Sequence, residues 1–261
     1  MQDNIELVRK KMLDADRASY GRNILKTVGF LSLEEQGVYH SLVRDFMSDT
    51  HFLYGGDEDN DRCMAFFVPE HVERDAAIEE SITAIVCEPL NRRFADELTH
   101  RDYLGAMMNL GIERECIGDI RILNGEHMGA VIYARADMAE YIARNLTKVK
   151  HTDVDAGCIC LKELKERGIV GTQEFEAVSV NIASERVDAV IAALYRVARQ
   201  KAADVINAER VFINGQAVSS AGKTLKEGDR VSVRGTGKFI YDGISGTSKK
   251  GRLFADIRKY V

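Results

Sequence analysis

The chain has 261 residues, of which 45% are hydrophobic, and it carries a formal net charge of −5. This length supports two or three compact domains, and the apolar fraction excludes an intrinsically disordered chain. No apolar run approaches 18 residues, and the amino terminus lacks a basic segment followed by a hydrophobic one, so we expect neither a transmembrane span nor a secretory signal. The five cysteines lack C-x-x-C spacing, which favours reduced thiols in a cytoplasmic protein.

The charge is divided unevenly along the chain. Residues 181–261 carry 15 Lys and Arg against 8 Asp and Glu, a net charge of +7, whereas residues 1–180 carry 21 against 33, a net charge of −12. A basic tail on an acidic body is typical of an RNA-binding protein, although a basic face can also be merely solvated. The acidic region could serve a protein partner.

Residues 1–75 are predicted to form an α/β domain. Helical spacing of apolar residues predicts helices over 3–20 and 32–49, the second with a capping box made by Ser32 and Glu35. Two apolar runs then predict strands at 51–54 and 63–68.

The loop between these two strands contains a D-x-D-x-D pattern. Asp57, Asp59 and Asp61 have the spacing of a calcium loop, but Arg62 occupies the position that requires glycine and Val68 the position that requires glutamate. We therefore expect a solvated hairpin loop and no metal site.

Residues 76–162 alternate between strand and helix patterns. The predicted order is β-α-β-β-α-β, a ferredoxin-like arrangement also used by RNA-recognition domains. The expected strands are 82–89, 116–123, 128–134 and 149–159, and the expected helices are 94–110 and 137–147. The fold does not select a function, and the strands lack the aromatic residues that usually stack on bases.

The segment His100-Arg101-Asp102 imitates the catalytic loop of protein kinases. That loop needs an asparagine where this chain has Met107, and the chain has no D-F-G and no glycine-rich phosphate loop. Kinase chemistry is excluded, and the segment is predicted to lie in the middle of a helix. We expect a structural role near Arg114, Glu115 and Asp119, with a surface contacting RNA or protein as the alternative.

Residues 181–261 are predicted to form two short helices followed by a small twisted sheet. Asn214-Gly215 is a strong hairpin signal, and Gly228-Asp229 predicts a second turn. The ordered motifs are R-x-D from Arg186, A-R-x-K-A from Ala198, V-x-I-N-G from Val211 and G-D-x-V-x-V-R from Gly228. The final residues, from Gly251, are expected to add a strand, with Lys249 and Lys250 in its turn.

These motifs, in this order, resemble the RNA-binding module of ribosomal protein S4. Two residues depart from that pattern. Ala198 stands where many members have serine, and Glu209 stands where they usually have glycine. The first departure removes a hydroxyl group, and the second adds a negative charge near the expected RNA face.

The middle of the chain resembles the central domain of the YlmH family. The resemblance is carried by F-A-D-E-L-T-H-R-D-Y-L-G-A-M-M-N-L-G-I-E-R-E-C-I-G-D-I from Phe94 and by Y-I-A-R-N-L-T-K-V from Tyr141, and R-G-T-G-K-F from Arg234 and K-K-G-R from Lys249 continue it. It implies an α+β protein with an N-terminal α/β domain, a ferredoxin-like RNA-binding domain and a C-terminal S4-like domain. It further implies a ribosome-associated RNA-binding protein of the bacterial cytoplasm, acting on large subunits that carry an obstructing peptidyl-tRNA, and a link to cell division.

The expected site is an RNA face without cofactor, metal or catalytic residue. Arginine suits bidentate contacts to phosphate, and lysine supplies a mobile charge. The predicted residues are Arg186, Arg199, Lys201, Arg230, Arg234 and Lys238. The expected partners are rRNA of the large subunit, tRNA and the ribosome. Replacing Arg186 and Arg199 together by glutamate is predicted to abolish RNA association without unfolding the chain.

Two other functions are open. An RNA-modifying enzyme is the first, because the same module is often attached to pseudouridine synthases and aminoacyl-tRNA synthetases. However, residues 1–160 contain no corresponding catalytic motif, and residues 181–261 contain neither histidine nor cysteine. A scaffold protein of cell division would need protein partners that the sequence does not reveal.

Overall fold

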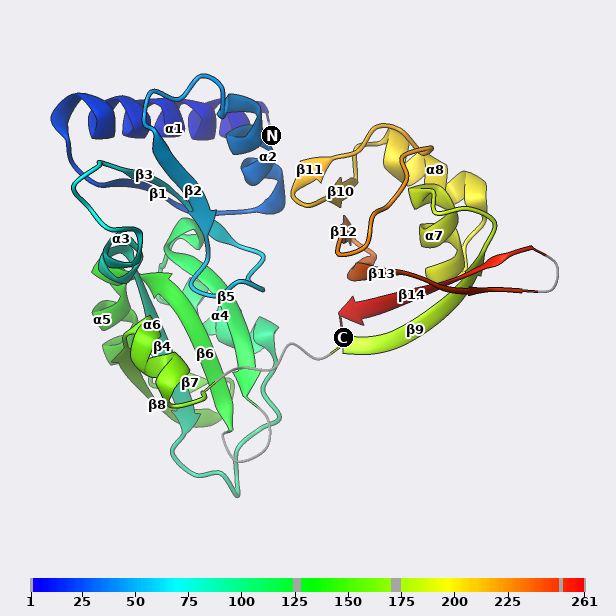
Figure 1. Cartoon of the computed structure of the whole chain (residues 1–261). Coiled ribbons are helices and arrows are strands. Elements are labelled where there is room, and N and C mark those ends of the chain that lie inside the picture. Colours follow the sequence, from blue (N-terminus) through cyan, green and yellow to red (C-terminus); the bar gives the residue numbers. More distant parts are fainter. Residues whose placement is uncertain (1, 124–127, 170–174, 249–250, 261) are drawn as a thin grey trace. The chain divides into compact units, whose positions relative to one another are not determined.

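The computed structural model describes residues 2–123, 128–169, 175–248 and 251–260. The chain divides into two compact units, residues 1–172 and 173–261, each with its own sheets and core (Figure 1). In the described part of the chain, no helix combines the length and the apolar character needed to cross a bilayer.

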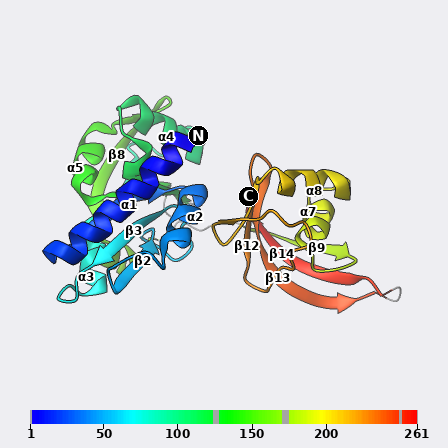
Figure 2. The same ribbon diagram turned by 90° about the horizontal axis from the view of Figure 1, so that it is seen from above.

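The first unit begins with a three-stranded antiparallel sheet in the order β1-β3-β2. Two helices pack on one of its faces, burying Val8 and Met12 of the first against Phe67 of the central strand. Figure 2 shows the first helix lying across these strands. The elements are α1 (Gln2–Arg22), β1 (Lys26–Leu31), α2 (Leu33–Leu42), β2 (Thr50–Tyr54) and β3 (Cys63–Val68).

The start of α2 follows the prediction, but its end does not. The Ser32 N–H donates to Glu35 Oε2 at 2.7 Å and the Glu35 N–H to Ser32 Oγ at 3.4 Å, so the capping box is present. The predicted helix to residue 49 was wrong, because Asp16 accepts the N–H groups of Met47 and Ser48 at 2.8 and 2.9 Å and holds them outside any helix. Strand β1 was not predicted.

The acidic loop between β2 and β3 packs against the next sheet and is not freely solvated. Buried Arg121 donates to Asn60 Oδ1 at 3.0 and 2.9 Å, and the Asp61 N–H donates to Asp119 at 2.6 Å. The predicted solvated hairpin loop is therefore correct only at its tip, where Glu58 and Asp59 are exposed. Among the described residues, no group of three or more His, Cys, Asp or Glu side chains is placed to hold a metal ion.

The second sheet of this unit has five antiparallel strands in the order β5-β6-β4-β8-β7. The first strand of the predicted β-α-β-β-α-β series lies between the third and the fourth, so the ferredoxin-like prediction is confirmed. The elements are α3 (Arg74–Ser81), β4 (Ile82–Pro89), α4 (His100–Asn109), η1 (Arg114–Cys116), β5 (Ile117–Leu123), β6 (Gly129–Arg135), α5 (Ala136–Asn145), β7 (Lys148–Val149), β8 (Thr152–Ile159) and α6 (Leu161–Glu166).

Both faces of this sheet are covered. Helices α4 and α5 bury Tyr103 and Ile142 on one face. On the other face α3, α6 and the three-stranded sheet form a second core, in which Phe30 and Phe66 pack with Ile82 and Tyr133. The sheet is thus the middle of a layered unit (Figure 1), and on β8 Asp153, Asp155 and Gly157 remain exposed.

The His100-Arg101-Asp102 segment is the first turn of α4, which corrects the prediction that it lies in mid-helix. The Thr99 N–H and hydroxyl both donate to Asp102 at 2.7 Å and cap the helix. Lys150 pairs with the same carboxylate at 2.9 Å, and these bonds from Lys150 and Thr99 lower the pKa of Asp102 to about 2. Asp102 therefore stabilises the start of a helix, beside Lys150 instead of the predicted neighbours Arg114, Glu115 and Asp119.

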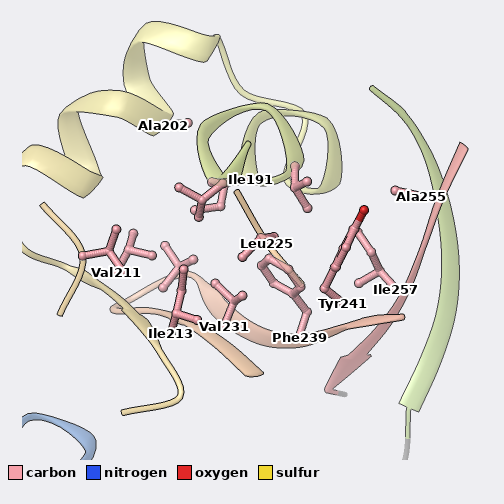
Figure 3. Packing of buried hydrophobic residues seen from close by; sticks show 14 of the residues in the cluster. Ile191, Ala202, Val211, Ile213, Leu225, Val231, Phe239, Tyr241, Ala255 and Ile257 are labelled. Carbon is pink, nitrogen blue, oxygen red and sulfur yellow. The ribbon is translucent and has the colours of Figure 1, made fainter. Parts of the chain in front are cut away.

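The second unit has a six-stranded antiparallel sheet in the order β11-β10-β12-β13-β14-β9. Helices α7 and α8 pack on one face, and the core includes Ile191, Ala202, Val231, Phe239 and Tyr241 (Figure 3). The elements are β9 (Phe175–Ile182), α7 (Val187–Leu194), α8 (Arg199–Asn207), β10 (Val211–Ile213), β11 (Gln216–Ala217), β12 (Arg230–Val233), β13 (Gly237–Thr247) and β14 (Leu253–Tyr260).

The hairpin and the final strand of this unit were predicted correctly. Asn214 and Gly215 both have positive φ, +50° and +79°, as a tight hairpin turn requires. Strand β14 is the predicted C-terminal strand, whereas Lys249 and Lys250 of its predicted turn lie outside the described residues. Strand β9 was not predicted.

Candidate nucleic-acid interface

Arg186 and Arg199 meet at one carboxylate, that of Asp188. Arg186 donates from Nε and Nη2 to the two Asp188 oxygens, each at 3.1 Å. Arg199 donates to the same oxygens at 3.0 and 3.3 Å. The two guanidinium groups therefore lie on either side of one acidic side chain, each held by two hydrogen bonds.

The backbone around Arg186 is fixed by a neighbouring segment. Arg186 is the N-cap residue of α7, and buried Val187, the first residue of that helix, anchors it in the core. The Val187 N–H donates to Lys223 O and the Leu225 N–H to Glu185 O, both at 2.9 Å. These two hydrogen bonds, one on each side of Arg186 in the sequence, fix its backbone and therefore the direction of its side chain.

The cluster is buried at its centre and exposed at its edges. The Asp188 side chain is only 4% exposed, whereas those of Arg186 and Arg199 are 43% and 51% exposed. Burial raises the pKa of Asp188, but the hydrogen bonds and charges of Arg199 and Arg186 outweigh it, so the pKa of this carboxyl lies below its ordinary value. The hydrogen bond between Arg199 and Asp188 in turn raises the pKa of Arg199.

With two guanidinium groups and one carboxylate, the cluster carries one net positive charge, and some of its N–H donors are not used within it. A guanidinium has five N–H donors, and within the described part of the chain neither Nη1 group has a hydrogen-bond partner. Such exposed, fixed donors suit the oxygens of a phosphate.

Lys201 lies in the first turn of α8, close in sequence to Arg199, and it is exposed. Ala198 is the N-cap residue of this helix and supplies no side-chain acceptor, so the first N–H groups of α8 have no cap. Uncapped N–H groups at a helix start favour anions. The departure from serine at residue 198 therefore affects a capping position.

Glu209 closes the other end of α8 with a left-handed backbone, φ +54°. Its N–H donates to Ile206 O at 2.9 Å and the Arg210 N–H donates to Val205 O at 3.1 Å, the two bonds of a Schellman motif. Only glycine adopts this conformation without steric cost. The preference of the S4 pattern for glycine at this position thus has a backbone explanation.

The remaining predicted residues lie on a different surface. Arg230 alternates with Val231 of the core along β12, and Lys238 pairs with Ser232, so Arg230 and Lys238 belong to the sheet face opposite α7 and α8. Exposed Arg234 follows β12, with its guanidinium 5.6 Å from the ring centre of Phe212. The structure therefore gathers Arg186 and Arg199 but does not bring this second group to them.

Sequence reasoning missed the residue that organises the cluster. Asp188 is the acid of the R-x-D motif, so the signal was present, but only the fold shows that Arg199 reaches the same carboxylate. Gly237 was also missed: a Cβ there would lie 2.9 Å from the Tyr195 hydroxyl, so the start of β13 needs a glycine to pass the end of α7.

Comparison with known proteins gives two domain matches. Residues 84–163 match the family described as "Putative RNA-binding domain in YlmH", and residues 185–231 match the S4 domain. The chain is 27% identical over 232 residues to the Bacillus subtilis (strain 168) protein named "Ribosome-associated protein quality control protein P2", covering 87% of this chain and 84% of that one. A solved structure named "Cell division protein ylmH from Streptococcus pneumoniae" is 18% identical, with a TM-score of 0.46, and covers 60% of this chain and 92% of its own.

Proposed function

We propose that this chain, which has the domain composition of the YlmH family, binds structured RNA on the large ribosomal subunit and catalyses no reaction. The observation that carries the proposal is the cluster of Arg186, Asp188 and Arg199 within the S4 domain. Two exposed guanidinium groups are held at fixed orientations by a buried acid, in the part of the chain that carries a charge of +7.

The cluster would recognise RNA by the position of its phosphates. Arg186 and Arg199 each donate two hydrogen bonds to Asp188, and their remaining N–H groups are available to a ligand. A phosphate would therefore meet donors that are already ordered. Lys201 and the uncapped first turn of α8 supply further donors beside Arg199. Recognition of this kind reads the shape of a folded RNA and not the sequence of its bases.

Arg230, Arg234 and Lys238 remain second-rank candidates. Arg230 and Lys238 lie on the sheet face opposite α7 and α8, so we do not expect a single duplex to touch them together with Arg186 and Arg199. We propose them as contacts to a separate RNA segment. Removing them should weaken binding without disturbing the cluster around Asp188.

One relative supports a more specific proposal. The Bacillus subtilis relative is named for ribosome-associated protein quality control, and we propose the same setting here, with rRNA and tRNA as the RNA partners. A ribosome-bound role places the chain in the cytoplasm. No metal-ligand cluster occurs among the described residues, and the proposal needs none.

Sedimentation through a sucrose gradient tests the proposal. The full-length protein in a lysate of its own cells should migrate with the large subunit at low salt and be released at raised salt, because each phosphate contact releases counterions. A protein that stays at the top of the gradient at both salt concentrations would contradict it.

A variant set connects this result to the cluster. Replacing both arginines by glutamate would place three carboxylates together, one of them buried, so this variant does not separate loss of an RNA contact from loss of folding. We therefore use Arg186→Gln, Asp188→Asn and Arg199→Gln together, which removes one net positive charge and leaves no buried charge unpaired. Arg144→Gln, in the first unit, removes one positive charge from an exposed pair with Glu140 and is the matched control.

A further inference from the structure

The matched RNA-binding domain of the first unit lacks the surface that such domains usually present. Ferredoxin-like RNA-recognition domains bind bases on an open sheet face. Here α4 and α5 cover one face of the five-stranded sheet, and α3, α6 and the three-stranded sheet cover the other. The part of the sheet that stays exposed, on β8, presents Asp153 and Asp155, whose charges repel phosphate. We therefore look for an RNA contact of this domain in a loop or at a helix end.

One loop carries side chains suited to that task. In the connection between β4 and α4, Phe94 is 84% exposed, the largest value for any large hydrophobic residue described, and Leu90 is 69% exposed. Arg92 and Arg93 lie between them and are both exposed. Figure 1 shows this connection extending past the end of the sheet. An aromatic ring with so little contact to the described residues, next to two arginines, is a feature that the core does not explain.

The loop is fixed at its base. The Leu90 N–H donates to Asp153 O at 3.0 Å, and the Asp96 N–H donates to Thr152 Oγ1 at 2.8 Å, so both ends are tied to β8. At the tip, the Phe94 N–H donates to Asn91 O at 3.3 Å and the Arg93 N–H donates to Asn91 Oδ1 at 3.1 Å. Phe94 is therefore presented from an ordered turn.

We propose that Phe94 stacks on an unpaired base of the bound RNA, with Arg92 and Arg93 beside the neighbouring phosphates. Aromatic rings stack on any base, and arginine adds charge and a planar surface. Arg92 contacts Glu88 at 3.4 Å, whereas Arg93 has no salt bridge within the described ranges. The proposal rests on the proposed function and adds a second RNA contact, outside the S4 domain.

The negative charge of the first 180 residues favours stacking on a single base over contacts along an extended RNA backbone. Their net charge is −12, so an extended RNA backbone would be repelled along this part of the chain. A single base on Phe94 needs only the local charge of Arg92 and Arg93. A protein partner would need a larger continuous apolar surface than one ring and Leu90 supply.

The sequence allows a direct test, because the chain contains no tryptophan. Phe94→Trp keeps an aromatic face and introduces a single fluorophore at the proposed site. Tyr141→Trp, on the exposed side of α5, is the control at another exposed aromatic position, where the side chain is 49% exposed. Both full-length proteins are titrated with single-stranded oligoadenylate and with purified large ribosomal subunits.

The expected result is strong quenching of the Phe94→Trp fluorescence by both probes and little change for Tyr141→Trp. Phe94→Ala should bind oligoadenylate roughly 5- to 100-fold more weakly than the original chain, and Phe94→Trp should not. The loop is solvent-exposed, so melting temperatures of the variants should match and exclude a folding defect.

Three outcomes separate the proposals. If the original chain binds neither probe, the proposed function fails as well. If it binds the subunit, but Phe94→Trp is not quenched and Phe94→Ala binds normally, only the stacking proposal is overturned. If Phe94→Ala loses the ribosome but still binds both oligoadenylate and protein-free rRNA normally, the loop contacts a protein and the stacking proposal is again overturned.

Discussion

Arg186 and Arg199, from the starts of two different helices, donate to the same two oxygens of Asp188. Neither arginine can move without disturbing the other, because the buried carboxylate between them has no other charge to pair with in the described structure. The arrangement couples the local shape of α7 to that of α8 and makes two flexible side chains into one surface.

Removal of one arginine should change the salt dependence of RNA binding. For Arg199→Gln, we expect the slope of log affinity against log salt to fall by roughly one unit, since one phosphate contact is lost. Arg144→Gln is the control, because it removes one positive charge from an exposed pair with Glu140 in the first unit. Titrations of large-subunit RNA at several salt concentrations measure both slopes. Equal slopes for Arg199→Gln and the original chain would remove Arg199 from the interface.

Asp188→Asn should lower both RNA affinity and stability. The neutral amide holds the two arginines less firmly, and we expect the free energy of unfolding to fall by about 1–2 kcal/mol at neutral pH, a modest value because both arginines are half exposed. Urea denaturation measures the stability. Unchanged RNA affinity in the folded variant would show that the orientation of the arginines does not matter.

The same variant should remove a pH dependence. The pKa of Asp188 in the folded chain lies below the value of about 3.9 in an unfolded chain, so its contribution is fully present above pH ~4 and is lost as the pH falls through the folded pKa. The stability difference between the original chain and Asp188→Asn should therefore be constant near neutrality and shrink in acid. A difference that grows as the pH falls would contradict the ion pairs.

Ala198→Ser should stabilise the second unit. A serine at this N-cap can accept the N–H of Lys201 or its neighbour, and such caps contribute about 1 kcal/mol. Thermal unfolding measures the gain, and Ala198→Val, which adds size but no acceptor, is the control. An equal effect of both substitutions would rule out capping as the cause.

Glu209→Gly should also stabilise the chain. Glycine relieves the left-handed strain at φ +54° but loses more entropy on folding, so the expected net gain is about 0.5–1 kcal/mol. RNA binding should strengthen slightly, because a negative charge is removed. Glu209→Gln removes the charge and keeps the strain, so comparing the two variants separates the effects.

Short sequence patterns correctly predicted the elements whose formation depends on residues close together in the sequence. The Ser32–Glu35 capping box and the Asn214-Gly215 turn are observed as predicted. The alternation of residues 76–162 predicted the observed order of strands and helices, although the helix expected from residue 94 begins only at His100. These features depend on backbone angles and spacing, which neighbouring residues fix. The S4 motifs likewise identified the unit that contains the cluster.

The missed features depend on distant contacts. Strand β1 contains Gly29, which weakens a strand pattern, yet a Cβ there would lie 2.6 Å from Glu115 O, so glycine is needed for the close approach of η1. The role of Asp188 likewise depends on Arg199, which only the fold brings near. The exposure of Phe94 was not predicted either, because residues 94–110 were expected to form one helix, whereas α4 begins only at His100 and leaves Phe94 in a loop.

Strand β9 pairs with β14 along its whole length, so Phe175 lies opposite Tyr260. The start of the first strand of this unit therefore lies beside the end of its last strand, although these residues lie at opposite ends of its sequence. A fragment limited to the matched S4 residues 185–231 would lack both strands and half of the sheet. Joining the two ends by a short linker and opening the unit elsewhere should give a circular permutant that still folds, which makes this unit a transferable RNA-binding module.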